Sequence, residues 1–156
     1  MRSNVKKHTM KIMAVASGGG HWVQLMRICK AFDDLEVVFV TAHQSYRSQV
    51  RDAKFYSVTD ANRNDPIGLV RAACQLCRII WKERPDVVVS TGAAPGYLAL
   101  RLGRLAGART VWLESIANVE QLSMSGRKIG PYADLWLTQW PTLARPEGPL
   151  YAGSVL

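Results

Sequence analysis

Short apolar runs alternate with helical patterns along most of this 156-residue chain. The runs have the length of buried strands, and several intervening segments repeat apolar residues at helical spacing. Alternation of this kind predicts an α/β fold, a doubly wound and mostly parallel sheet with helices on both faces. The predicted strands are Lys11–Ala16, Leu35–Thr41, Phe55–Thr59, Asp86–Ser90, Thr110–Glu114 and Leu135–Thr138, and the predicted helices are His21–Phe32, Pro66–Glu83 and Pro95–Leu105.

The carboxyl ends of the predicted strands are where a ligand is expected in a sheet of this class. In the common strand order 3-2-1-4-5, the first and fourth strands are neighbours, so the turns that follow them should face each other. Three segments stand at this edge: residues 17–21, residues 90–96 and the pair Glu114-Ser115. The sequence therefore places a candidate site there.

The first of these segments, Ser17-Gly18-Gly19-Gly20-His21, joins a strand to a helix through three glycines. Bare N–H groups at a helix N-terminus, together with the helix dipole, form an anion site, usually for phosphate. The spacing does not fit a dinucleotide-binding turn, and no acidic residue ends the second strand. A P-loop is excluded because no Gly-Lys-Ser/Thr follows the glycines. The alternative is a tight turn that binds nothing.

The second segment, residues 90–96, is another turn of small residues that leads into a helix. Two helix N-termini that face each other suit a diphosphate better than a single phosphate. The candidate substrate-binding residues are Ser17, Gly18, Gly19, Gly20, Thr91, Gly92, Ala93, Ala94, Gly96 and Ser115.

A formal net charge of +8 indicates an anionic partner, either a phosphorylated substrate or an anionic membrane surface. Nucleic acid is not expected, because the sequence has no basic run, zinc-finger spacing or aromatic RNA-binding strand signature. Of the three cysteines, Cys29, Cys74 and Cys77, the last two fall within a helical pattern and are predicted to be buried thiols. A reducing cytoplasm is the expected compartment, and no metal site or cofactor is expected. Neither a secretory signal nor an apolar run of membrane-spanning length is visible.

The long helix Pro66–Glu83 carries an apolar arc wider than packing on one sheet face requires. A wide apolar arc with a cationic stripe and a tryptophan suits a helix that lies on an anionic bilayer. The alternative is a helix wedged between the sheet and a neighbouring element or a partner protein. The predicted membrane-facing residues are Leu69, Arg71, Leu76, Arg78, Ile80 and Trp81.

Five segments together resemble a known family: residues 17–21, residues 85–92, the pair Glu114-Ser115, residues 137–141 and residues 151–156. The chain is similar to the acceptor-side subunit of split GT-B glycosyltransferases. That family includes asparagine-linked-glycosylation protein fourteen and its bacterial capsule and exopolysaccharide relatives of the PssD type. These proteins are similar in turn to the N-terminal half of the peptidoglycan enzyme MurG.

The resemblance implies a Rossmann-like GT-B N-terminal domain over residues 11–156, preceded by a basic tail at residues 1–10. Its expected acceptor is a polyprenyl-diphosphate-linked saccharide in polysaccharide biosynthesis. The UDP-sugar donor is expected to bind mainly to a partner subunit of the GT-B C-terminal type, so the chain should be active only with that partner. The implied location is the cytoplasmic face of a bacterial membrane, held peripherally.

Two residues are candidates for catalysis of the sugar transfer. His21 stands at a helix N-terminus, which favours the neutral ring that a general base needs. The alternative for His21 is an orienting role in the glycine turn. Glu114 is expected to orient acceptor hydroxyls more readily than to act as a base.

Two other functional classes remain open. The first is a non-catalytic anchor that recruits a glycosyltransferase to the membrane. The second is a free-standing phosphosugar- or nucleotide-binding enzyme such as an epimerase. The apolar segment Tyr151–Leu156 is predicted to have no element of its own to pack on, and the resemblance to split enzymes suggests that it docks on the cleft face of the partner.

Overall fold

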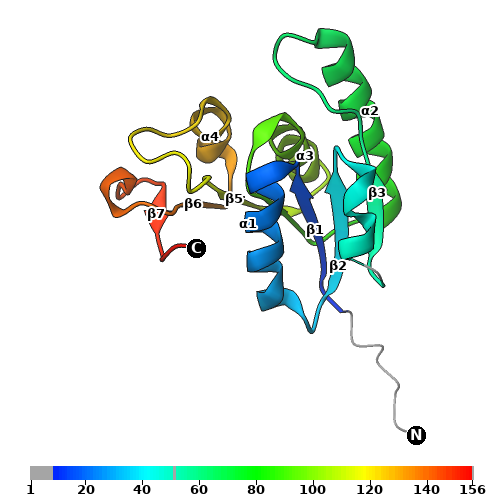
Figure 1. Ribbon diagram of the computed structural model, residues 1–156, viewed down its shortest axis with the longest axis horizontal. Coiled ribbons are helices and arrows are strands. Elements are labelled where there is room, and N and C mark those ends of the chain that lie inside the picture. The colour runs from blue at the N-terminus through cyan, green and yellow to red at the C-terminus, as the bar shows by residue number, and fades with distance from the viewer. Residues whose placement is uncertain (1–8, 51, 156) are drawn as a thin grey trace, which may run out of the picture.

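The computed structural model describes residues 9–50 and 52–155, and within them seven strands form one parallel sheet. The strand order is β3-β2-β1-β4-β5-β6-β7, from one edge of the sheet to the other (Figure 1). The predicted doubly wound fold and the order 3-2-1-4-5 are confirmed. The strands are β1 Lys11–Ala16, β2 Glu36–Thr41, β3 Lys54–Ser57, β4 Val87–Ser90, β5 Arg109–Leu113, β6 Leu135–Thr138 and β7 Leu150–Tyr151.

Helices cover both faces of the sheet because alternate residues of each strand point to opposite sides. On one face, Ala14 of β1 packs in a buried cluster with Trp22 of α1. On the other face, Met13 of β1 packs in a second cluster with Leu76 of α2 and with α3 residues. The α-helices are α1 Gly19–Cys29, α2 Pro66–Glu83, α3 Ala93–Leu105 and α4 Met124–Ile129, and the 3-10 turns are η1 Lys30–Phe32, η2 Gln44–Gln49, η3 Gly130–Tyr132 and η4 Pro141–Leu143.

Helix α2 has the predicted bounds, and its first turn shows why. The Asp65 side chain accepts a hydrogen bond from the Gly68 N–H at 2.9 Å, and Pro66 occupies the first helical position. The helices α1 and α3 each begin two residues earlier than predicted. The last residues of the two small-residue turns already belong to the helices. Each turn therefore contains the N-terminus of the helix that follows it. Helix α4 and strand β7 were not predicted.

The outward surface of α2 corrects the predicted membrane face. Leu76 is fully buried and Ile80 is 3 % exposed, because both pack in the core against the sheet. Leu69 is half-buried, while Arg71, Arg78 and Trp81 are exposed as expected. Apart from Trp81, the exposed apolar side chains of α2 differ from the predicted ones. We call them the α2 surface stripe: Ile67, Val70, Cys74, Cys77 and Trp81.

The prediction that Cys74 and Cys77 are buried was wrong for both residues. Cys29 is buried. Its burial, and to a smaller extent the nearby Asp33 charge, raise the pKa of the thiol to about 12. Cys74 and Cys77 are exposed, contrary to expectation, because the half of α2 that carries them faces away from the sheet. Of the predicted basic tail at residues 1–10, residues 1–8 lie outside the described part of the chain.

At the amino ends of the strands, opposite the candidate site, a buried carboxylate links three elements of the fold. Glu83, at the end of α2, accepts hydrogen bonds from Tyr56 at 2.5 Å, from Lys54 at 3.0 Å and from Lys11 at 3.3 Å. Burial alone would raise the pKa of Glu83, but these three partners outweigh it and lower the pKa to about 2. The cluster joins β1, β3 and α2 and leaves the carboxyl end of the sheet to the site.

Candidate functional site

The turns after β1 and β4 meet at the carboxyl edge of the sheet, as the strand order predicted. His21 Nδ1 lies 2.8 Å from the carbonyl oxygen of Thr91. Thr91 Oγ1 in return donates to the carbonyl oxygen of His21 at 2.6 Å. Two hydrogen bonds therefore lock the N-terminus of α1 to the turn that opens α3.

The two turns share a backbone geometry. Gly19 has φ 55° and Ala93 has φ 64°, and each is the first residue of its helix. A left-handed residue followed by right-handed helical residues directs successive N–H groups toward one point, which makes a concave anion site. Ala93 pays for this conformation, since the left-handed region costs a non-glycine residue roughly 1 kcal/mol. Strain of this kind concentrates at functional sites.

The hydrogen bond from His21 fixes which ring nitrogen is available. A carbonyl oxygen only accepts, so Nδ1 carries the proton and, in the neutral ring, Nε2 holds the free lone pair. The ring also packs against Gly92, where a β-carbon would meet it. Gly92 itself has φ 138°, a conformation that favours glycine. The turn after β4 thus holds the neutral His21 ring in the Nδ1–H tautomer, with the lone pair on Nε2.

The predicted substrate-binding residues differ in accessibility. Gly19 and Gly20 are exposed, and Ser17, Gly18, Ala93 and Ala94 are half-buried, so these six line the surface. By contrast, Thr91, Gly92, Gly96 and Ser115 are buried. These four residues lie beneath the surface, and their contact with substrate stays a prediction. At Gly96, for example, a β-carbon would collide with the Ser90 hydroxyl of β4.

Glu114 is also buried, with 1 % of its surface exposed. One carboxylate oxygen accepts from the indole N–H of Trp112 at 2.8 Å. The other accepts at 2.7 Å from the Asn118 side chain and from the Ser123 N–H. With both oxygens engaged inside the protein, Glu114 holds the loop between β5 and α4 in place rather than facing an acceptor. This geometry does not favour the predicted orienting of acceptor hydroxyls.

A buried pair of amides behind the glycine turn was missed by the sequence analysis. Gln24 of α1 accepts from Gln139 at 2.6 Å and from the Ile116 N–H at 3.0 Å, and it donates to the Ser115 hydroxyl at 3.2 Å. Gln139, just after β6, accepts from the Val155 N–H at 2.8 Å. The sequence offered one indication of this network: Gln24 is a polar residue on the side of the helix that carries apolar residues.

The C-terminal segment packs on its own domain, contrary to the prediction that it had nothing to pack on. Tyr151 pairs with Thr138 in the β6–β7 ladder. The Val155 carbonyl accepts from Arg27 of α1 at 2.8 Å, in addition to the bond from its N–H to Gln139. Leu156 lies outside the described residues. The side chain of Tyr151 is nevertheless 46 % exposed and so remains available to a partner.

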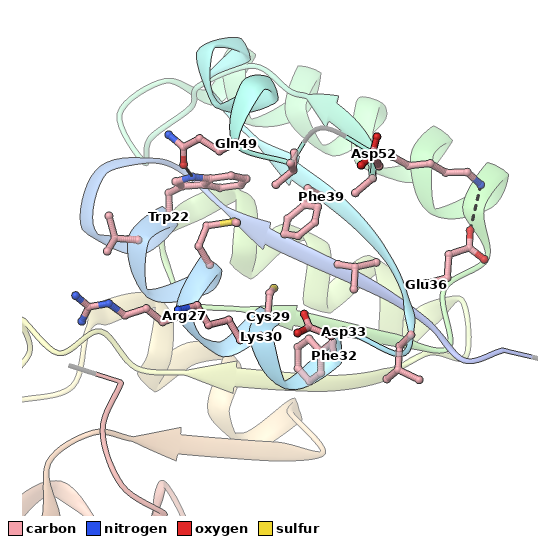
Figure 2. Close-up of a pocket in the computed structure, with 17 residues that line it drawn as sticks. Trp22, Arg27, Cys29, Lys30, Phe32, Asp33, Glu36, Phe39, Gln49 and Asp52 are labelled. Atoms are coloured by element: carbon pink, nitrogen blue, oxygen red, sulfur yellow. Dashed lines mark hydrogen bonds and ion pairs between the residues drawn. The ribbon is translucent and has the colours of Figure 1, made fainter.

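The segment that connects β2 to β3 lies against the glycine turn and was not predicted to take part in the site. The Tyr46 hydroxyl accepts a hydrogen bond from the Gly19 N–H at 3.0 Å, and a β-carbon at Gly18 would collide with the His43 ring. A groove of about 890 Å³ runs from this segment along the α1 face. Figure 2 shows Trp22 and Gln49 at one end of the groove, joined by a hydrogen bond of 2.8 Å.

Within residues 9–50 and 52–155, every helix is too short or too polar to cross a membrane.

Solved structures with the same fold define the class of protein. MurG of Acinetobacter baumannii aligns with a TM-score of 0.78 and 14% identity over 93% of this chain, but over only 46% of its own. A UDP-N-acetylglucosamine 2-epimerase from Rickettsia bellii aligns with a TM-score of 0.70 and 16% identity, over 95% of this chain and 46% of its own. The chain thus spans less than half the length of these proteins. It is a Rossmann-like α/β domain with the fold found in GT-B glycosyltransferases such as MurG.

The sequence then places the chain within that class. A family model described as "Oligosaccharide biosynthesis protein Alg14 like" matches residues 12–154, and the chain belongs to this family. The UDP-N-acetylglucosamine transferase subunit ALG14 of Yarrowia lipolytica is 25% identical over 168 residues, covering 89% of this chain and 77% of the relative. The mouse protein of the same name is 37% identical over 73 residues, covering 42% of this chain and 33% of the relative.

Proposed function

We propose that this chain is the acceptor-binding subunit of a two-subunit glycosyltransferase. In this proposal it binds a polyprenyl-diphosphate-linked saccharide, and a partner subunit supplies N-acetylglucosamine as its UDP derivative. The donor sugar is taken from the names of the relatives, which are UDP-N-acetylglucosamine transferase subunits. The observation that carries the proposal is the pair of facing turns, which brings the N-termini of α1 and α3 together at the carboxyl ends of the strands.

His21 is the candidate general base of this reaction. The acceptor hydroxyl attacks the anomeric carbon of the donor sugar, the hydroxyl proton passes to Nε2, and UDP leaves with the electrons of the broken bond. The Thr91 carbonyl would stabilise the protonated ring through the Nδ1–H bond it already makes. Glu114 acts indirectly in this scheme, by fixing the loop that follows β5.

A reconstituted assay tests the catalytic role. The chain and its partner subunit are incubated with radiolabelled UDP-N-acetylglucosamine and a synthetic polyprenyl-diphosphate-linked saccharide. His21→Asn keeps a side-chain N–H for the Thr91 carbonyl and removes Nε2, so kcat should fall about 10²- to 10⁴-fold while complex formation is unchanged. If His21→Asn turns over at the wild-type rate, His21 is not the general base.

The α2 surface stripe favours peripheral membrane binding as a second part of the function. Ile67 is 82 % exposed and Trp81 76 %, with the exposed Arg71 and Arg78 beside them. Apolar side chains flanked by cations suit an anionic bilayer surface. Ile67→Glu with Trp81→Glu should abolish flotation with anionic vesicles and leave the fold intact. Leu76→Glu is the contrasting variant, since it should unfold the domain. Undiminished flotation of the folded double variant would reject this surface.

The epimerase alternative is disfavoured by sequence rather than by fold. Structures of both kinds share this α/β domain, so the fold alone does not separate them. The family match over residues 12–154 and the names of the relatives favour a transferase subunit. A test for epimerisation of UDP-N-acetylglucosamine by the isolated chain should therefore be negative.

A further inference from the structure

Tyr46 is held against the glycine turn by a set of contacts that all orient its hydroxyl. Its ring stacks on the buried Trp22 with centroids 4.8 Å apart and planes 7° from parallel. Trp22 is fixed in turn by the hydrogen bond from its indole N–H to Gln49. His43 meets the Tyr46 ring edge-on at 5.8 Å. The 3-10 turn η2 thus presents one phenol to the N-terminus of α1.

The chemistry of that phenol complements the turn. Its oxygen accepts the Gly19 N–H at 3.0 Å, which uses a lone pair and leaves the hydroxyl proton for another acceptor. A phosphate oxygen bound by the next N–H groups, those of Gly20 and His21, would lie beside this hydroxyl. A hydroxyl polarised by one hydrogen bond donates more strongly to an anion.

We propose that Tyr46 is an acceptor-binding residue, whose hydroxyl donates to a diphosphate oxygen while it accepts from the Gly19 N–H. The inference rests on the proposed function, because it takes the diphosphate to lie at the glycine turn. It adds a recognition element from the β2–β3 connection, 25 residues beyond His21 in the chain. The stack on Trp22 removes the rotational freedom that a lone surface tyrosine would lose on binding.

Tyr46→Phe tests the inference with little structural disturbance, because phenylalanine preserves the stack on Trp22. The probe is a water-soluble, short-chain isoprenyl diphosphate, titrated against the wild-type chain by calorimetry. Affinity should fall about tenfold in Tyr46→Phe, the usual loss for one hydrogen bond to a charged group. In the reconstituted enzyme, KM for the lipid acceptor should rise similarly while KM for the UDP-sugar stays constant. Tyr132→Phe, which removes the hydroxyl of an exposed tyrosine, is the control and should bind normally.

The outcomes separate the inference from the proposed function. If the wild-type chain does not distinguish the isoprenyl diphosphate from the corresponding uncharged alcohol, the diphosphate site itself is wrong. If the wild type binds it and Tyr46→Phe binds equally well, the hydroxyl does not contact the ligand and the inference fails. Tighter binding by Tyr46→Phe also overturns it, because the hydroxyl would then compete with phosphate for the Gly19 N–H.

Discussion

Gly20→Ala should separate the two reasons a glycine can occupy this turn, the needs of the fold and the needs of a ligand. A β-carbon at Gly20 has only the Gln24 amide nitrogen nearby, at 4.0 Å, so the domain has room for it. Gly20 lies in the first turn of α1, where alanine should stabilise the fold by about 0.5 kcal/mol. The same methyl group covers N–H groups that we expect to bind phosphate, and losing charge-assisted hydrogen bonds there should cost acceptor affinity about 10- to 100-fold.

The predicted result is a chain that melts slightly higher and works worse. A stabilisation of this size should raise Tm by about 1–2 °C in a scanning calorimeter. Acceptor KM is measured in the reconstituted enzyme, with Gly19→Ala as the comparison. A β-carbon at Gly19 also meets no neighbour, but its φ of 55° makes alanine strained and should lower stability by about 1 kcal/mol. A Gly20→Ala enzyme with the wild-type acceptor KM would refute a ligand at this turn.

Three further predictions concern stability and assembly. Because the folded pKa of Glu83 is depressed to about 2, its ionised form stabilises the fold above about pH 4.5, and this contribution is lost as the pH falls toward 2. Glu83→Gln should therefore lower the free energy of unfolding at pH 7 by about 2–3 kcal/mol and flatten its pH dependence below pH 4.5, measured by urea denaturation. Ala93→Gly should relieve the left-handed strain and raise stability by up to about 1 kcal/mol in the same assay; a loss would show that the strain is absent. Tyr151→Arg should weaken co-purification with the partner subunit without changing Tm, and full retention of the partner would exclude this edge of the sheet as the contact.

The sequence was informative where local pattern and topology act together. Aspartate and proline before an amphipathic run set the start of α2, and the expected strand order predicts that the two turns lie side by side, as they do. Which side of a helix packs on the sheet was harder to predict from the sequence. The apolar arc of α2 is so wide that its pattern does not say which half meets the sheet. Leu76 and Ile80 were therefore assigned to the surface although they belong to the core.

Two of the contacts that the sequence could not predict join residues distant in the chain, and a third set closes a loop around a carboxylate. Tyr46 reaches Gly19 only because the β2–β3 connection is a short 3-10 turn that lies over the glycine turn. Gln24 and Gln139 are 115 positions apart, and their pairing depends on how far β6 extends toward α1. Glu114 follows a strand in the way catalytic residues often do, yet the loop beyond it closes over the carboxylate.

If main-chain N–H groups bind the acceptor, as we propose, the sequence of the site can change widely during evolution. Every residue except proline carries this donor, so neighbouring side chains can be replaced while the donor persists. What must be kept is empty space above the turn and a backbone able to bend left-handed at Gly19 and Ala93. Relatives at 25% identity can accordingly retain one ligand chemistry with few side chains in common. On the proposed function, an inhibitor that copied the anion would rely mainly on main-chain donors, and substitutions that block those donors would exclude the substrate too.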